Sequence, residues 1–354
     1  MSNHVDGHEG VRIRSARGLG RLTLDRPRAI NALDRAMVGA LTDALDRWRD
    51  DPDVERVLID GAGERGLCAG GDVRGVVQLI AAGRLEQVAD FFRAEYALNA
   101  LIAGYPKPIV AFADGVTMGG GIGLAGHASV RVVTERSRLA MPETRIGMSP
   151  DVGGTRLLAR APGRLGEYLA LTGATMDAAD AIHAGFADHL VPSERLPDVL
   201  DALETRADPA GAAELMMLFD ETPDEAALAR ARPWIDDCFS APTLAQIIER
   251  LRARPEPQAG AAADELALMS PTALAVALDA VRSARRLPHL RAVLEQEYAI
   301  MMWFAATQPD LPEGVRALLV DKDRSPRWNP PRIGDVASDA GAQAMAFVPA
   351  LPLW

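Results

Sequence analysis

Two acidic residues could carry acid–base chemistry in this chain. Glu143 and Asp151 stand eight residues apart (151 − 143), in a segment that contains Pro142 and Pro150 and is otherwise largely apolar. A carboxylate beside proline in such a segment loses part of its hydration, which raises its pKa toward the range useful for general acid–base work. Both residues could equally be solvated loop acids, and the residues by themselves leave the two interpretations open.

Two glycine-rich segments could bind a developing negative charge. They are Cys68–Asp72 and Met118–Gly123, and each opens a predicted helix. Glycine lets the backbone approach a ligand closely, and the first N–H groups of a helix have no partner within the helix. Two such groups aimed at one oxygen would stabilise an oxyanion, where the loss of one donor costs about 2.7–4 kcal/mol. The alternative is that both segments are tight turns in a packed fold.

A dinucleotide site is the competing interpretation of the second segment. Gly121–Gly126 fits G-x-G-x-x-G, and Glu143 follows Gly123 by 20 residues (143 − 123). That fingerprint needs its first glycine directly after a strand. Here residues 114–120 intervene after the strand that ends at Ala113, so the pattern argues against nucleotide binding.

Nucleophilic and metal-ligating side chains are poorly placed. Ser149 is followed by proline and lacks the final glycine of the G-x-S-x-G elbow, and Cys68 has no histidine near it in the sequence. His127, His183 and His189 do not have the spacing of metal ligands. We therefore expect no metal and no cofactor.

The elements that must position these residues alternate between strand and helix. Asp34 is a predicted cap for a helix with Met37, Leu41 and Trp48 on its apolar face, and 85–103 is a second amphipathic helix. Such alternation is typical of α/β architecture. The predicted strands are 11–15, 21–24, 57–59, 109–113, 130–133 and 139–141.

The chain changes character after about Pro192. The remainder is rich in Ala, Leu, Glu and Arg, and we expect helices broken at Pro223, Pro233, Pro242, Pro255 and Pro271, with a loop over 254–263. The predicted organisation is an α/β core over 1–200, a helical region over 201–335 and a partly mobile tail over 336–354.

Composition excludes several classes of partner. A net charge of −11 over 354 residues disfavours nucleic acid. Two cysteines cannot form a disulfide framework and suggest a reducing compartment. No uncharged stretch reaches the roughly 18 apolar residues that a membrane span needs, and residues 1–10 lack the pattern of a leader. The expectation is a cytoplasmic protein with no membrane partner.

Several ordered motifs together resemble the crotonase (enoyl-CoA hydratase/isomerase) superfamily, and most strongly its hydrolase branch for 3-hydroxyisobutyryl-CoA. About nine-tenths of the chain is covered. The motifs are Leu22–Pro27, Asn31–Leu33, Cys68–Asp72, Phe91–Tyr96, Thr117–Gly121, Met141–Thr144, Pro150–Gly154, Leu171–Gly173, Ser270–Thr272, Glu313–Arg316 and Asp321–Asp323.

The resemblance implies a fold and a set of site residues. The fold is an α/β spiral of β-β-α units with a helical C-terminal part. An acyl-CoA substrate would place its thioester carbonyl against the backbone N–H groups of Gly71 and Gly120. Glu143 and Asp151 match the catalytic acids, and Glu95 matches a substrate-contacting glutamate.

One departure separates the branches. Hydratases of this superfamily carry a second glutamate just after the glycine run, where this chain has Gly123. The resemblance therefore implies hydrolysis of a short hydroxyacyl-CoA, 3-hydroxyisobutyryl-CoA first, to the free acid and CoA, in the setting of valine breakdown. Enoyl-CoA hydration or isomerisation is the alternative, and a homo-oligomer is an expected assembly.

Overall fold

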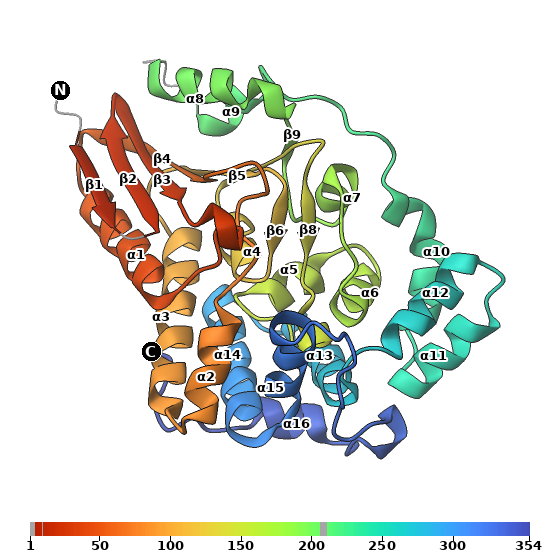
Figure 1. Cartoon of the computed structure of the whole chain (residues 1–354). Helices are drawn as coiled ribbons and strands as arrows, with labels where there is room; N and C mark the ends of the chain where they lie inside the picture. The colour runs from red at the N-terminus through yellow and green to blue at the C-terminus, as the bar shows by residue number, and fades with distance from the viewer. Residues whose placement is uncertain (1–3, 9, 206–210) are drawn as a thin grey trace. The chain divides into compact units, whose positions relative to one another are not determined.

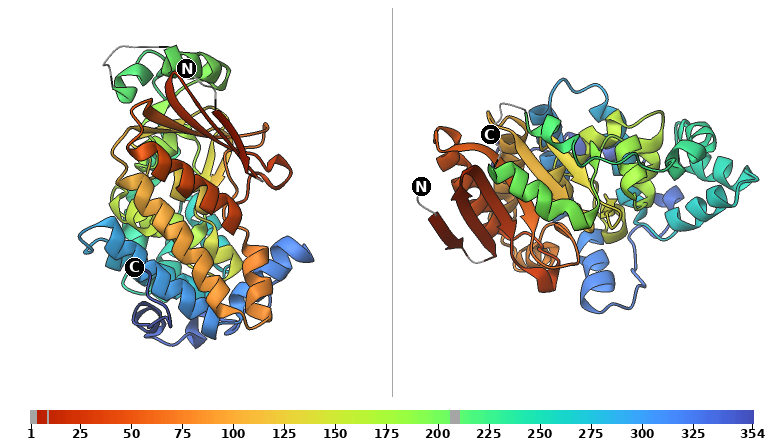
Figure 2. Two further views of the ribbon diagram at one scale, coloured as in Figure 1. Left: turned by 90° about the vertical axis from the view of Figure 1, so that its left-hand side faces the viewer. Right: turned by 90° about the horizontal axis from the view of Figure 1, so that it is seen from above.

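The computed structural model describes residues 4–8, 10–205 and 211–354. Residue contacts divide the chain into two compact units. We call the first the glycine unit (1–71, 94–139 and 176–226) and the second the acid unit (72–93, 140–175 and 227–354). Figures 1 and 2 show the elements. Both units are discontinuous in sequence, and the boundaries near 200 and 335 stay predictions.

A seven-stranded sheet is the centre of the glycine unit. Its first two pairings are antiparallel and the remaining four are parallel. Short apolar runs such as 109–113, buried at every position, suit parallel strands covered on both faces. In spatial order the strands are β1 (His4–His8), β2 (Val11–Ala16), β3 (Gly18–Leu24), β4 (Val54–Gly61), β5 (Ile109–Ala113), β7 (Val130–Val133) and β9 (His189–Leu190), and a second sheet pairs β6 (Val116–Met118) with β8 (Arg138–Ala140).

Helices cover this sheet with their apolar faces. Helix α1 (Arg35–Arg49) begins where the Asp34 carboxylate accepts a hydrogen bond from the Met37 N–H at 2.9 Å, as an N-cap does. Helices α8 (Leu196–Thr205) and α9 (Ala212–Met216) pack against Leu58, Val110 and Val132 of the strands. Helix α4 (Gly120–Ala125) is buried throughout, and α7 spans Ala178–His183.

The acid unit is helical, and its central helix is α13 (Pro271–Ala284), which α5, α6, α14 and α16 contact (Figure 1). Helix α3 (Leu85–Ala103) begins in this unit and ends in the other. The remaining bounds are α2 (Val73–Ala81), α5 (Gly154–Arg160), α6 (Leu165–Thr172), α10 (Ala227–Phe239), α11 (Leu244–Ala253), α12 (Pro257–Leu266), α14 (Leu290–Thr307), α15 (Asp310–Val315) and α16 (Ala340–Met345).

Two predictions about the helical region are wrong. The expected loop over 254–263 contains most of α12, because Pro257 is tolerated in a first helical turn and the alanines after it favour helix. Pro233 does not end a helix but lies inside α10, where the buried Leu228 precedes the break in its hydrogen bonds and the buried Trp234 and Phe239 follow it.

The predicted tail over 336–354 contains α16, whose Ala340 and Ala344 are buried. The Tyr298 hydroxyl donates to the Leu351 carbonyl at 3.0 Å, and the Arg291 guanidinium lies 3.9 Å from the centre of the Trp354 ring. Over the described ranges, no single helix is long and apolar enough to cross a membrane, and only the bent pair α12–α13 passes that test, by length and composition.

Candidate functional site

The two glycine segments run side by side in the glycine unit. Cys68 and Thr117 form a parallel β-bridge, and the Met118 N–H donates to the Cys68 carbonyl at 2.9 Å. This pairing brings the two turns together, so that a Cβ atom built on Gly120 would lie 3.1 Å from the Gly71 nitrogen. Among the hydrogen bonds of the described residues, none is donated by the N–H of Gly71 or Gly120. Two adjacent free donors are what an oxyanion hole requires.

Glycine is needed at positions 70, 119 and 120 for two separate reasons, backbone conformation and space. Gly119 has φ 48° and ψ −118°, and Gly70 has φ 116°, conformations that other residues rarely adopt. At Gly120 the obstacle is space, because an added Cβ would lie 2.7 Å from Oε1 of Glu95. The space beside Gly120 is therefore open only because this residue has no side chain.

Glu95 lies beside the glycine pair on α3 and is buried. The resemblance matched it to substrate contact, and the structure places it against Gly120. Its charge also affects Cys68: burial, and secondarily the Glu95 carboxylate, raise the pKa of the Cys68 thiol to about 12. Because a thiol is a poor nucleophile until it ionises, the burial and the raised pKa of Cys68 argue against its acting as a nucleophile.

Asn99 was missed by the sequence analysis. It follows Glu95 by four residues on α3, a spacing that puts both side chains on one face of the helix. Asn99 is fully buried, and neither its amide nitrogen nor its amide oxygen has a hydrogen-bond partner in the described chain. A buried unsatisfied polar group costs about 1–3 kcal/mol. An asparagine one turn after Glu95 in an apolar helix is the signal that could have revealed it.

The two predicted acids lie on one loop of the acid unit. Glu143 opens the 3-10 helix η2 (Glu143–Ile146), and Asp151 precedes α5. Both residues are buried, with 5% and 4% of the residue surface exposed, so they are not solvated loop acids. Thr144 fixes the loop, because its hydroxyl donates to the Leu171 carbonyl at 3.2 Å and its carbonyl accepts from the Ser270 N–H at 3.2 Å.

The late motifs of the chain support this loop. A Cβ on Gly314 would lie 2.5 Å from the backbone of Ile146, and one on Gly147 would lie 2.3 Å from the Asp310 carbonyl. Asp310 is itself held by the Ser270 hydroxyl at 2.5 Å and the Asn329 N–H at 2.8 Å. Burial raises the pKa of the Asp310 carboxyl. Backbone contact this close explains why glycines stand at both positions.

Glu297 is a second residue that the sequence analysis missed. It is fully buried on α14 and accepts three hydrogen bonds, from the N–H of Gly153 at 2.6 Å, the N–H of Thr155 at 3.0 Å and the Thr155 hydroxyl at 2.5 Å. These bonds hold the turn just after Asp151, where Val152 and Gly153 have positive φ. Burial, with the nearby Asp151 charge, raises the pKa of Glu297 to about 8. An acid inside the apolar run of α14 was the available signal.

The predicted site residues thus fall into two groups. Gly71, Gly120 and Glu95 meet within the glycine unit, and Glu143 and Asp151 share a buried loop of the acid unit. The part of the chain that the structure describes contains no group of three or more metal-ligating side chains.

Comparison with known proteins identifies the family to which the chain belongs. A family model described as Enoyl-CoA hydratase/isomerase matches residues 19–345. The chain belongs to the enoyl-CoA hydratase/isomerase family. Membership confirms the predicted crotonase-type α/β fold with its helical C-terminal part.

Individual relatives bear different names. The chain is 40% identical to the mitochondrial 3-hydroxyisobutyryl-CoA hydrolase of Mus musculus over 96% of this chain and 89% of that one. Among solved structures, a carnitinyl-CoA dehydratase from Mycobacterium thermoresistibile is 43% identical with a TM-score of 0.92, covering 98% and 99% of the two chains. An enoyl-CoA hydratase from Rhodobacter sphaeroides is 43% identical with a TM-score of 0.88, covering 96% and 98%.

The 3-hydroxyisobutyryl-CoA hydrolases among these relatives overturn the prediction of a cytoplasmic protein. The mouse enzyme and other hydrolases of the family are named as mitochondrial. Charge, cysteine count and hydropathy describe the folded domain. They do not encode a compartment, which is why the prediction drawn from them had no firm basis.

Proposed function

We propose that this family member hydrolyses a short hydroxyacyl-CoA thioester, with 3-hydroxyisobutyryl-CoA the first candidate, to the free acid and CoA. The observation that carries the proposal is a pair of buried acids, Glu143 and Asp151, combined with glycine at position 123. The hydrolases of this name that match over nearly the whole chain support it, and valine breakdown is the corresponding setting.

The mechanism assigns a step to each group. The N–H groups of Gly71 and Gly120 donate hydrogen bonds to the thioester oxygen and stabilise the charge that develops on it. Glu143 attacks the carbonyl carbon, the C–S bond breaks, and CoA leaves as a thiol after it gains a proton. Water then hydrolyses the mixed anhydride with the help of Asp151, which releases the acid and restores Glu143. In the alternative route Glu143 deprotonates the water directly.

Labelled water distinguishes the two routes. In a single turnover with H₂¹⁸O, the covalent route leaves label in the Glu143 carboxyl, because one of its oxygens is exchanged when the anhydride opens at the enzyme carbonyl. If neither Glu143 nor Asp151 acquires label, the covalent route loses its support.

Asn99 supplies the recognition of the acyl hydroxyl in this proposal. A substrate hydroxyl can donate to its amide oxygen and accept from its amide nitrogen, which would satisfy the two buried groups that lack partners in the chain. A site built to hydrogen-bond a hydroxyl rejects substrates that lack it. We therefore assign a hydroxyacyl rather than a simple acyl group.

Hydration is the second candidate, because two similar solved structures are titled as a dehydratase and a hydratase. Gly123 lies buried in α4 and carries no acid, and the loss of a general acid–base partner costs roughly 10²–10⁴-fold in rate. Release of free thiol from 3-hydroxyisobutyryl-CoA supports hydrolysis. Loss of enone absorbance from crotonyl-CoA without thiol release supports hydration instead.

The decisive variant is Glu143→Gln. We expect it to lower thiol release by roughly 10²–10⁴-fold while the protein stays folded. Glu249→Gln, which removes an exposed carboxylate from α11 of the same unit, is the control and should keep full activity. Near-normal thiol release from Glu143→Gln would overturn the assignment.

A further inference from the structure

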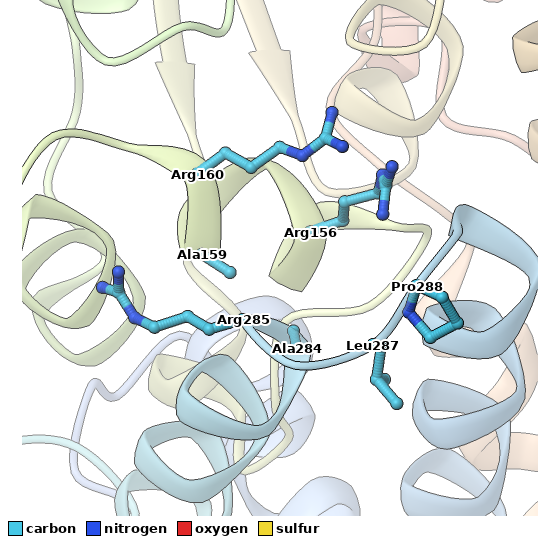
Figure 3. A pocket seen from close by; sticks show the side chains of 7 residues that line it. All are labelled: Arg156, Ala159, Arg160, Ala284, Arg285, Leu287 and Pro288. Atoms are coloured by element: carbon cyan, nitrogen blue, oxygen red, sulfur yellow. The ribbon is translucent and has the colours of Figure 1, made fainter.

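A pocket of about 320 Å³ opens on the acid unit, and none of the residues assigned above lines it. One wall comes from α5 and the other from the end of α13 and the turn after it (Figure 3). Its lining residues are Arg156, Ala159, Arg160, Ala284, Arg285, Leu287 and Pro288.

Two of its arginines carry charges that no carboxylate balances. Arg156 and Arg160 are four residues apart on α5, and their guanidinium groups extend to the same side of the helix (Figure 3). Throughout the described ranges, neither forms an ion pair or a side-chain hydrogen bond. Burial, and then repulsion from Arg160, lower the pKa of Arg156. The third arginine is different, because Arg285 pairs with Glu167 at 2.6 Å.

The chain has more acidic than basic residues, 49 against 38. Several arginines of the acid unit pair with carboxylates, as Arg145 does with Glu265 and Arg316 does with Glu313, whereas Arg156 and Arg160 form no such pair with any described residue. Two neighbouring guanidinium groups, one of them partly desolvated, raise the energy of the unliganded protein. An anion between them would lower it, and arginine suits phosphate because it binds in a bidentate fashion.

The rest of the pocket is apolar. Ala159 and Ala284 are buried together with Val293, and Leu287 packs against them. A volume of 320 Å³ corresponds to about ten water molecules at roughly 30 Å³ each, more than one inorganic ion fills. The pocket therefore fits a ligand with an anionic end and an apolar body.

We propose that this pocket binds a phosphate monoester of a small organic molecule. The phosphate lies between Arg156 and Arg160, where its two charges balance theirs, and the organic body lies on the surface of Ala159, Ala284 and Leu287. The proposal does not depend on the thioesterase assignment, since none of these residues belongs to it.

Isothermal titration of the full-length protein tests the proposal, with phenyl phosphate and inorganic phosphate as the probes. We expect saturable binding of phenyl phosphate that is at least several-fold tighter than that of inorganic phosphate. Arg156→Gln and Arg160→Gln should each weaken it by about tenfold or more, the loss of one charge-assisted contact. Arg252→Gln, which removes an exposed charge on α11, is the control and should leave binding unchanged. Thermal melting of each variant checks that it is folded.

The outcomes are distinct. Absence of saturable binding, equal affinity for both probes, or an equal loss in Arg252→Gln would each overturn the proposal. A second titration in the presence of CoA identifies the source of the phosphate: competition assigns the pocket to a phosphate of CoA itself, and unchanged binding assigns it to a separate ligand.

Discussion

Glu297→Gln is the most informative change to the acid unit, because the amide fixes this buried position in its uncharged form. The glutamine oxygen can replace Oε1 and keep both bonds from Thr155. Its amide group then faces the Gly153 N–H, which now donates to Oε2 at 2.6 Å. One buried acceptor is lost between two donors, and we expect a cost of about 1–3 kcal/mol in the free energy of unfolding at pH 5.

The wild-type protein loses this advantage as the pH rises. The pKa of Glu297 is raised from 4.5 to about 8 in the folded state. Between these values the folded protein keeps a proton that the unfolded chain has released, so stability falls as the pH increases, by about 1.4 kcal/mol per unit. From pH 5 to pH 8 the wild type loses roughly 3–4 kcal/mol from this group, and the glutamine variant loses none. The two stability curves should therefore cross between these limits.

Urea unfolding of both proteins at half-unit steps from pH 5 to pH 8 measures the difference. Glu295→Gln, at an exposed position two residues earlier on α14, is the control and should differ from wild type by a constant amount. The reasoning is refuted if the difference between Glu297→Gln and wild type is also constant with pH, because Glu297 would then keep the same charge in the folded and unfolded states.

Three further predictions concern the glycine unit and its neighbours. Gly120→Ala should lower thiol release by roughly 10²–10³-fold, because the new methyl group would contact Glu95 and the Gly71 nitrogen. The control is Gly260→Ala, which has open space around it and should be active and no less stable. Asn99→Leu should stabilise the fold and lower the preference for 3-hydroxyisobutyryl-CoA over isobutyryl-CoA by on the order of tenfold or more, and equal preference before and after would contradict its assignment. Cys68→Ala should retain thiol release, since the thiol stays protonated; a dead but folded variant would contradict this.

Local sequence patterns predicted the elements whose signals are local. The strands 109–113 and 130–133 and the helix 85–103 coincide with β5, β7 and α3, because continuous apolar runs and a helical period are read within a few residues. The Asp34 cap is confirmed for the same reason. The prediction of a loop over 254–263 was wrong because a proline is compatible both with a break and with the first turn of a helix.

The site was predictable only in part. Glu143 and the glycines belong to short sequence motifs, so their possible roles could be predicted from the residues next to them. Glu297 and Asn99 gain their meaning from residues that folding brings near them, such as Gly153, which precedes Glu297 by 144 residues (297 − 153). Nothing in the neighbourhood of Glu297 in the sequence indicates that its partners are backbone donors of a distant turn.

The contact between Gly314 and the Glu143 loop has a consequence during synthesis of the chain. A ribosome that has just joined Ile146 must add 168 more residues (314 − 146) before the supporting backbone exists, which takes roughly 8–34 s at 5–20 residues per second. Every residue of the glycine unit has been joined once Ala226 is added. A nascent chain therefore acquires the whole of the glycine unit early and the support of its Glu143 loop only when synthesis is nearly complete.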